Sequence, residues 1–422
     1  MRIFAIFRYK DLRKKIIFIL FCFFVFRILA NVPIPGIEKE KVEAFFERNQ
    51  FFGFLNLFTG GALGNFSIGM LGLGPYITAV IILQLLTFIV PSLERLYKEE
   101  GEEGRRKFNQ YGRILSFPIA SLQAFGMLNF LEREGVFVSS SFLNISSGVL
   151  SVAAGSVFLM WLGELISEKG LGNGISLLIF AGIIARSPFY FYQLIKTFTF
   201  QKLPSLILFL VLAVFITFGV VLVTEAKRNI PVNYAKRVRG RKIFGGVKTF
   251  LPVPLNPAGV IPIIFAISVL IAPSMIGSFF AHSENPFLKK ISEISLNFSQ
   301  NLFWYSFLYF ILVFFFTYFY TAVTFDPKSV AENLQKMGAF IPGVRPGKET
   351  ENYLSRVLTR ILVFGGVFLG LIAISPSFVQ KFTGVAVFSF LVGGTSLLII
   401  VAVILETWKI LETELQMRGY EK

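Results

Sequence analysis

The sequence has almost none of the residues that build metal clusters or disulfide frameworks. Its 422 residues include one cysteine, Cys22, and one histidine, His282. Disulfide frameworks need paired cysteines, and structural zinc sites need several Cys or His ligands, so neither is available here. Cys22 falls inside an apolar run, where we expect it to pack, and His282 falls in a polar stretch, where we expect it to be solvated.

Charged residues are scarce as well, and acidic ones are the scarcer kind. Charged side chains make up 16% of the chain, whereas a soluble domain carries about 25%. Hydrophobic residues make up 54%, and the mean hydropathy is +0.68. The apolar residues also form runs of about 18 or more, the length that crosses a bilayer. We therefore predict a polytopic, all-α membrane protein.

Ten apolar spans can be placed along the chain. The first has a basic start like a signal peptide, but no A-x-A cleavage site follows, so we predict that it is retained. Most of the 41 Lys and Arg residues lie in the N-terminus, the C-terminal tail and every second connection. Basic residues mark the cytoplasmic side, so both termini are predicted to be cytoplasmic. The predicted spans are 16–31, 70–91, 115–130, 147–166, 174–195, 204–224, 258–276, 302–324, 361–375 and 384–405.

Two of the basic connections, at about 225–257 and 325–360, are long for simple links between spans. Both alternate basic, aromatic and turn residues. We predict that they form a docking surface for a large acidic partner. The residues expected to contact that partner are Arg239, Arg241, Lys242 and Arg345.

Ionisable groups are nearly absent from the spans. Glu164 and Glu225 lie at cytoplasmic span ends, Arg27 lies near the outer end of the first span, and Arg186 lies at a span edge. Ion-coupled transporters usually bury Asp, Glu or His at mid-membrane. Intramembrane proteases need a catalytic set that these spans do not contain. We predict no catalytic site, no metal site, no cofactor and no enzyme activity.

Short internal repeats point to a duplicated plan. "GISLLIF" at 174–180 has a counterpart in "GTSLLII" at 394–400, and "PYI" at 75–77 has one in "PII" at 262–264. The counterparts are five spans apart, so the two halves, 1–200 and 201–422, would be inverted in the membrane. The repeats bring small and aliphatic residues to comparable points. They are either ordinary helix-packing residues or a hydrophobic ring that closes a central pore by dewetting.

A glycine-rich stretch precedes the second span. Six of the fifteen residues from Gly60 to Gly74 are glycine, although the stretch stays apolar. Each interior glycine costs a helix roughly 0.5–1 kcal/mol relative to alanine. The glycines therefore either allow this backbone to move or allow another element to approach it closely.

Long motifs in this order resemble the SecY family, the large subunits of protein-translocation channels. The motifs are "FRILANVPIPGI" (26–37), "SIGMLGLGPYITAVIILQLL" (67–86), "EEGRRKFNQYGR" (102–113), "MWLGELISEKGLGNGISLLIFAGI" (160–183), "VNYAKRVRGRK" (232–242), "NPAGVIPIIFA" (256–266), "VAENLQKMGAFIPGVRPGKET" (330–350) and "GGTSLLIIVAVILET" (393–407).

The resemblance implies three structural devices. A plug, described in the family as a short half-helix, would occupy about 54–68 and include Gly60, Gly61, Gly64 and Phe66. A side opening to lipid, the lateral gate, would be lined by Thr78, Gln84 and Asn256, which can equally make interhelical hydrogen bonds. A pore ring would consist of Leu73, Ile77, Ile175, Ile179, Ile264 and Ile399. Leu73 stands where the family usually has isoleucine.

The resemblance also implies function and partners. It suggests a cell inner-membrane channel that passes unfolded secretory polypeptides, recognised by their signal peptides, and releases apolar segments sideways into membrane lipid. The expected partners are small SecE and SecG type subunits, a SecA-type ATPase and the ribosome. The alternatives are a secondary transporter of a small solute or a membrane enzyme, and the spans lack the ionisable or nucleophilic groups that either needs.

Overall fold

The chain is mostly helical, as expected, and forms two compact units. One unit is Met1–Ser205 with Val385–Lys422, and the other is Leu206–Gly384. The first boundary lies close to the expected division at residue 200, whereas the last helix groups with the first unit. The computed structural model describes residues 9–34, 59–98, 100–133, 142–197, 199–200, 203–234, 237–239, 242–244, 248–267, 269–270, 285–300, 302–383 and 394–420.

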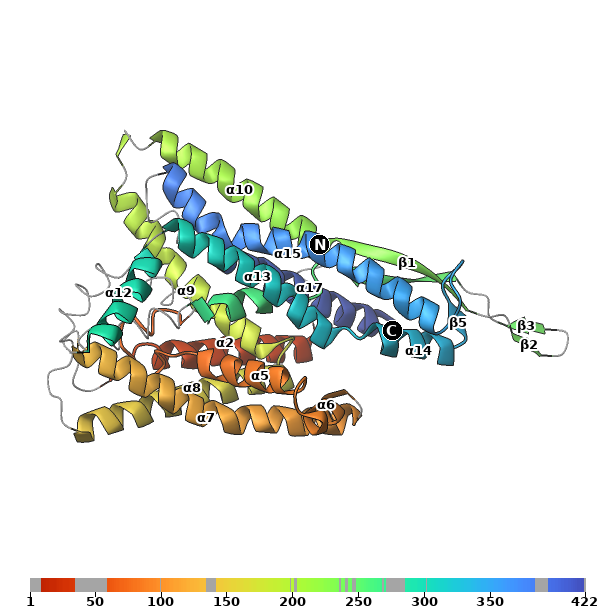
Figure 1. Cartoon of the computed structure of the whole chain (residues 1–422), viewed down its shortest axis with the longest axis horizontal. Coiled ribbons are helices and arrows are strands. Elements are labelled where there is room, and N and C mark those ends of the chain that lie inside the picture. The colour runs from red at the N-terminus through yellow and green to blue at the C-terminus, as the bar shows by residue number, and fades with distance from the viewer. Residues whose placement is uncertain are drawn as a thin grey trace. The chain divides into compact units, whose positions relative to one another are not determined.

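The first unit is a bundle of helices. Helix α8 packs against α7, α9, α5 and α2, and α17 packs against α9. Figure 1 shows α7 and α8 running side by side with α5 close to them. The helices of this unit are α2 (Lys10–Leu29), α5 (Gly74–Leu86), α6 (Pro91–Lys98), α7 (Gly101–Arg133), α8 (Phe142–Lys169), α9 (Gly174–Thr197) and α17 (Gly394–Tyr420).

Helix α5 begins and ends abruptly, for local reasons. Pro75 occupies its first turn, where a residue without an N–H loses no helical hydrogen bond. The helix ends after 13 residues, and the chain bends by 112° before α6. Within the expected span 70–91, the residues of α5 and residue 91 are helical, whereas residues 70–73 and 87–89 are turns.

The second unit contains α10 (Leu203–Glu225), α12 (Pro286–Gln300), α13 (Leu302–Thr324) and α15 (Lys348–Thr383). The α13–α15 pair makes close contact because α15 carries glycines against aromatic rings. A Cβ at Gly366 would lie 2.9 Å from Cδ2 of Phe314, and a Cβ at Gly370 would lie 2.5 Å from Cδ2 of Phe310. Small residues that let helices approach closely are typical of membrane bundles.

The second unit also holds strands that the sequence analysis did not predict. Strand β1 (Lys227–Tyr234) pairs antiparallel with β4 (Lys248–Pro254) and with β5 (Ala339–Phe340). Alternate β1 side chains, Ile230 and Val232, are buried, as the period of a strand requires. A separate hairpin, β2 (Arg237–Arg239) and β3 (Lys242–Phe244), lies beyond the end of the β1–β4 ladder (Figure 1).

The three-stranded sheet shares a hydrophobic core with α14 (Pro327–Lys336) and the start of α15. We call these parts together the strand module. Asp326 caps α14 by accepting a hydrogen bond from the Lys328 N–H, and Pro327 fills the first helical position. The core residues are Ile230, Val232, Val253, Leu334, Ala339, Ile341, Leu354, Val357 and Ile361. The two long basic connections therefore fold into one structure instead of two separate loops.

Five helices in the described part of the chain are long and apolar enough to cross a membrane, or six if the bent α5–α6 pair is one span. They are Leu143–Lys169, Gly174–Lys196, Leu203–Glu225, Phe303–Lys336, which takes α13 and α14 together, and Lys348–Thr383. Four of them contain a complete expected span, and Phe303–Lys336 covers the span 302–324 except for its first residue. The expected spans 16–31, 115–130 and 384–405 fall wholly or partly on α2, α7 and α17, which are not among these five, and residues 384–393 lie outside the described part of the chain.

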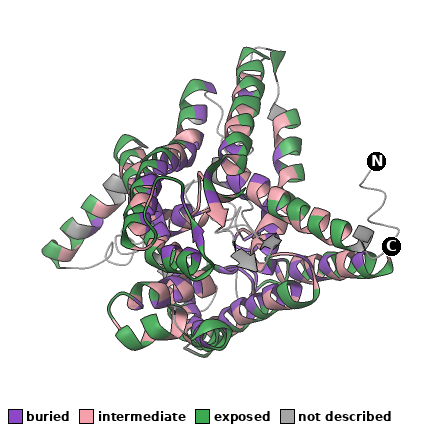
Figure 2. Cartoon of the chain, turned by 90° about the vertical axis from the view of Figure 1, so that its right-hand side faces the viewer, coloured by how far each residue is buried: buried purple, intermediate pink, exposed green. Residues whose placement is uncertain are grey.

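Exposed apolar residues run along the helices. In the most apolar helix, Leu203–Glu225, only 17% of its most apolar 18-residue stretch is buried. Leu210, Val214 and Phe218 are exposed. Figure 2 shows exposed residues along most helices, with buried residues on their other faces. Such surfaces are costly in water and are the normal lining of a helix in lipid.

Candidate functional site

Residues 59–73, which we call the turn segment, connect toward α5 without forming a helix. Consecutive turns hold the backbone, including Ala62 N–H to Thr59 C=O and Met70 N–H to Ser67 C=O. The half-helix implied for the plug is therefore not formed by residues 59–68, and residues 54–58 lie outside the described part of the chain. Irregular backbone at membrane depth is tolerated only where its polar groups find partners within the protein.

The turn segment is hydrogen-bonded to the residues that follow α2. Pro33 and Ser67 form an isolated antiparallel bridge, flanked by Ile34 N–H to Phe66 C=O at 2.9 Å and Ile68 N–H to Val32 C=O at 3.0 Å. The hydroxyl of Ser67, which is fully buried, donates to the Ala62 carbonyl. These hydrogen bonds satisfy backbone N–H and C=O groups of the turn segment that have no helical partners.

Phe66 anchors the segment in the first unit. Its side chain is 0% exposed, although its φ of 40° lies in the left-handed region that a bulky residue rarely adopts. It packs in a buried cluster with Leu63 and Met70 of the segment and with α7 and α8. The cluster residues are Ile34, Leu63, Phe66, Met70, Ala124, Met127, Leu128, Leu131 and Val152. Burial of this ring offsets the strained backbone.

Two of the predicted plug glycines are required by their surroundings. Gly60 has φ of 65° and Gly61 has φ of 92°. A Cβ at Gly60 would lie 2.9 Å from Cα of Gly182, and a Cβ at Gly61 would overlap the guanidinium of Arg186. The alternative of close approach therefore holds at these positions. Gly64 is half-buried, and mobility of the segment stays a prediction.

The sequence analysis located Arg27 and Arg186 but gave them no role. In the structure Nη1 of Arg27, on α2, donates to the Gly60 carbonyl at 2.6 Å. Nη2 of Arg186, on α9, donates to the Gly61 carbonyl at 3.2 Å. A charge at the edge of an apolar span is by default a functional candidate, and that signal could have identified both arginines.

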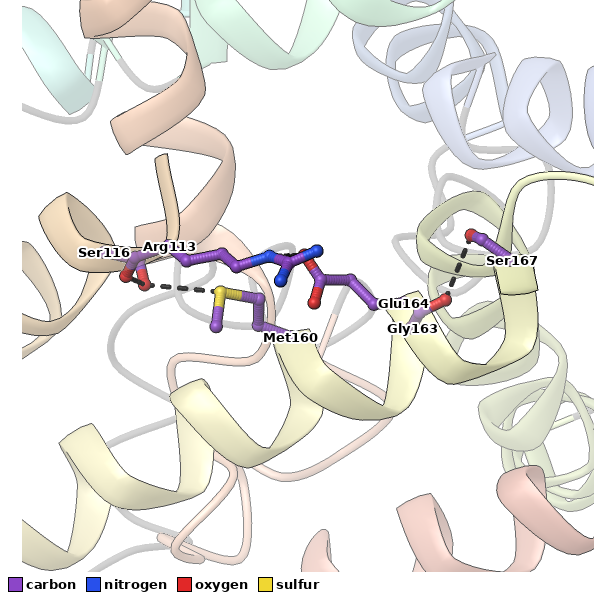
Figure 3. Close-up of polar contacts among 6 residues, drawn as sticks. All are labelled: Arg113, Ser116, Met160, Gly163, Glu164 and Ser167. Carbon is purple, nitrogen blue, oxygen red and sulfur yellow. Dashed lines mark hydrogen bonds and ion pairs between the residues drawn. The ribbon is translucent and has the colours of Figure 1, made fainter. Parts of the chain in front are cut away.

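Glu164 also has a partner. Figure 3 shows the guanidinium of Arg113, on α7, paired with the Glu164 carboxylate on α8. On the same helix Ser167 donates to the Gly163 carbonyl at 3.1 Å and accepts from the Gly174 N–H at 2.8 Å. These contacts fix α8 against α7 and against the start of α9, where two ring candidates lie.

The ring candidates lie near helix starts. In the first unit Leu73 precedes α5, Ile77 is in its first turn, Ile175 and Ile179 are in the first two turns of α9, and Ile399 is in the second turn of α17. Leu73 and Ile399 are buried, and the other three are half-buried. Ile264 is half-buried in the helical stretch 261–267 of the second unit. That these six residues form a ring stays a prediction.

The three gate candidates are half-buried, and two make local hydrogen bonds. The Thr78 hydroxyl donates to the Gly74 carbonyl of its own helix at 2.9 Å. The Asn256 amide donates to the Gly259 carbonyl at 3.0 Å, and its Oδ1 is buried with no partner among the described residues. Gln84 lies two turns after Thr78 on α5. None of these bonds is interhelical.

Of the described docking candidates, Arg345 lies in the connection between β5 and α15, and the other two lie on the β2–β3 hairpin. The Arg345 side chain is exposed, and its carbonyl accepts from the buried Thr350 hydroxyl at 2.9 Å. Arg239 and Lys242 are paired positions of the β2–β3 hairpin. Arg241 lies outside the described residues, as does His282.

The described residues contain no candidate metal centre. Among the described residues, no group of three or more His, Cys, Asp or Glu side chains lies close enough to hold a metal ion. Cys22 is buried, in agreement with a packing role. The arrangement is one of helices, a buried irregular segment and a basic surface module.

The chain is similar to translocase subunits over nearly its full length. It is 43% identical to the protein translocase subunit SecY of Aquifex aeolicus, covering 99% of this chain and 97% of the relative. It is also 43% identical to that of Thermotoga maritima, covering 98% and 95%. Identity of this extent includes the turn segment, the spans and the strand module.

Solved structures share the fold. One, solved as a protein-conducting channel, matches with a TM-score of 0.66 at 21% identity, covering 94% of this chain and 91% of that chain. A SecY structure concerned with the plug domain matches at 0.65 and 21%, with the same coverage. The Sec61 of a canine ribosome–channel complex matches at 0.62 and 19%, again with 94% and 91% covered.

The SecY family model matches residues 67–408, from the turn segment to the last helix. Most of the chain, and every element described above except α2, falls within or overlaps that match. The chain therefore belongs to the SecY family.

Proposed function

We propose that this chain is the channel subunit of a protein translocase, a passive conduit through which unfolded secretory polypeptides cross the membrane. The observation that carries the proposal is its 43% identity, over 99% of its length, to a protein translocase subunit SecY. The energy would come from a partner, because neither the sequence nor the described residues offer a catalytic set.

The proposed arrangement has ten spans in two inverted halves. The protein lies in the inner membrane, and both termini are on its cytoplasmic side. The distribution of Lys and Arg supports the sidedness. The repeats at 174–180 and 394–400 support the inverted halves, because both begin at the start of a helix, α9 and α17.

The proposed closure has two layers. Residues 59–68 of the turn segment belong to the plug predicted at about 54–68, and the six aliphatic residues from Leu73 to Ile399 are the ring. A hydrophobic constriction stops ions by dewetting, so it needs no charged filter. The plug assignment is supported by the buried, irregular backbone of residues 59–68 and by likeness to a SecY structure whose plug domain stabilises the closed state of its channel.

Partners would dock on the strand module, the hairpin and Arg345. Their cations suit the phosphates of ribosomal RNA and acidic protein faces alike. The similarity to the Sec61 of a ribosome–channel complex supports a ribosome as one partner. A SecA-type ATPase would use the same surface, and small SecE and SecG type subunits would pack on the helices.

The proposed lateral gate contains Thr78, Gln84 and Asn256. Apolar segments would leave through it according to their hydrophobicity, with a central Leu or Ile worth about −0.5 kcal/mol and a central Arg or Asp about +3 kcal/mol. The Oδ1 of Asn256, buried with no partner among the described residues, supports a polar role there, because such an acceptor costs free energy until a donor reaches it.

The proposal is tested by reconstituting the chain with SecE and SecG type subunits in planar bilayers. The triple variant Ile77→Ser, Ile175→Ser and Ile264→Ser should conduct ions at rest, whereas wild type should be closed until a SecA-type ATPase drives a secretory chain through it. A triple Val variant is the matched control, because it keeps the positions apolar and should stay closed.

A correctly folded Ser variant that conducts no more than wild type would overturn the ring. If the wild-type protein moves no polypeptide but takes up a small solute, the channel proposal is wrong and the secondary-transporter alternative is supported. Co-purification sharpens the distinction, since a channel should bring a small helical subunit at equal stoichiometry.

A further inference from the structure

Two arginines from different helices hold two adjacent carbonyl groups of the turn segment. Nη1 of Arg27 lies 2.6 Å from the Gly60 oxygen, and Nη2 of Arg186 lies 3.2 Å from the Gly61 oxygen. Arg27 lies in the last turn of α2, and Arg186 lies on α9. Both side chains are half-buried. The contacts bring together positions 33 and 125 residues apart in sequence.

These arginines have no acidic counterpart in the described part of the chain. Neither forms an ion pair there, and Arg186 stacks at 5.6 Å over the ring of Phe189, which holds its guanidinium in place. A charge at a span edge needs hydrogen-bond acceptors. The carbonyls of Gly60 and Gly61 supply acceptors, so in the described part of the chain two like charges share one short piece of backbone.

Glycine at both positions makes the approach possible. A Cβ on Gly61 would occupy the place of the Arg186 guanidinium, and a Cβ on Gly60 would crowd Phe26 and Gly182. Both residues also have positive φ. By contrast a Cβ on Gly69, in the same segment, would make ordinary contacts at 3.6 Å or more, and its φ is not positive.

We propose that Arg27 and Arg186 are a latch that holds the turn segment in its closed position, and that Gly60 and Gly61 are its receiving surface. The inference rests on the proposed channel function and names what keeps the plug seated. The bonds are charge-assisted, so they are strong, but water can replace the carbonyls as acceptors once the segment moves. The latch is therefore reversible.

The first test measures the resting conductance of the reconstituted complex. Arg27→Gln and Arg186→Gln should each raise it about tenfold, the effect of losing one hydrogen bond to a charged group. The double variant should leak more than either single one. Arg186→Lys keeps a charged donor and should restore part of the closure. Gly61→Ala should leak like Arg186→Gln, whereas Gly69→Ala should stay closed.

The second test separates a latch from general damage. In a Cys22→Ser background, Pro33→Cys and Ser67→Cys would place two thiols at the bridged pair, where non-hydrogen-bonded partners lie about 4.5 Å apart between Cα atoms. Oxidation should pin the segment and close the leak of the Arg186→Gln variant. Reduction should reopen it.

The latch is overturned if the double Gln variant stays as closed as wild type while the Ser ring variant conducts. It is also overturned if the leak persists after oxidation and follows a loss of thermal stability, because the arginines are then structural only. If the Ser ring variant is silent and wild type moves no polypeptide, the channel proposal itself has failed, which is a different result.

Discussion

The turn segment and the strand module satisfy their non-helical backbone in opposite ways. The module pairs β1 with β4 and β5, so a regular ladder serves most of its peptide groups. The turn segment has one bridge and otherwise uses single turns and side chains, among them Ser67, Arg27 and Arg186. The bonds of the turn segment thus come from several unrelated partners, each of which can be removed by its own substitution.

The two regions also differ in what surrounds their cores. The module packs on α14 and on the start of α15, within its own small hydrophobic core. The segment inserts Phe66 into a core provided mostly by α7 and α8, together with Ile34, which follows α2. The module is therefore stabilised mainly by contacts among its own parts, whereas the turn segment is stabilised mainly by contacts with neighbouring elements.

The largest effect is expected from removing the anchor of the segment. Phe66→Ala should cost about 3–5 kcal/mol of unfolding free energy, because it leaves a cavity in a closed cluster. It should also raise the resting conductance. Thermal unfolding in detergent and bilayer recordings measure the two effects. Phe125→Ala is the matched control, since Phe125 is 52% exposed on α7; an equal loss in both variants would contradict the anchor.

A similar cavity in the module should affect docking and leave closure intact. Leu354→Ala should cost about 2–5 kcal/mol, because Leu354 is 1% exposed in the module core. Limited proteolysis should cut the module sooner, and partner-stimulated ATP hydrolysis should fall, with resting conductance unchanged. Phe250→Ala, on the 62% exposed position of β4, should do little. A leak in Leu354→Ala would end the proposed separation of roles.

Overpacking should act on the segment from the side of α8. A Cβ at Gly155 would overlap the Ile68 carbonyl oxygen, so Gly155→Ala should cost about 1–3 kcal/mol and make the channel leak. At Gly219 of α10 the nearest atom would be 3.7 Å away, so Gly219→Ala should stabilise by about 0.5–1 kcal/mol. Differential scanning calorimetry compares them, and a destabilised Gly219→Ala would show that the contact argument is incomplete.

The smallest effect on stability is expected at Arg345. Arg345→Glu should change unfolding free energy by less than about 0.5 kcal/mol, because the exposed side chain makes no described bond. It should still reduce translocation and partner-stimulated ATP hydrolysis. Arg239→Glu and Lys242→Glu should behave likewise, with partner binding that weakens as salt rises.

The contrast for Arg345 is Thr350→Val. That change removes the hydroxyl that holds the Arg345 carbonyl and should cost about 0.5–1.5 kcal/mol. Loss of expression in Arg345→Glu as great as its loss of transport would indicate a structural role for the arginine instead.

Local features were readable from the sequence. Apolar runs predicted the helices, and Pro75 and Asp326 stand at helix starts as their chemistry requires. The family followed from long motifs, and the glycines at 60–74 marked an irregular segment. The strands at 227–254 were missed, because β1 contains a proline and its partner β5 lies about a hundred residues further on.

By itself, then, the sequence determined that this chain is a membrane protein of the SecY family, and where its five long apolar helices lie. Only the tertiary structure decided that the two basic connections share one core, that Phe66 is buried with a left-handed backbone, and that Arg27 and Arg186 meet at Gly60 and Gly61. The physical reason is that hydropathy and propensity act between near neighbours in the chain. Hydrogen bonds across 33 or 125 residues exist only after the intervening helices have packed.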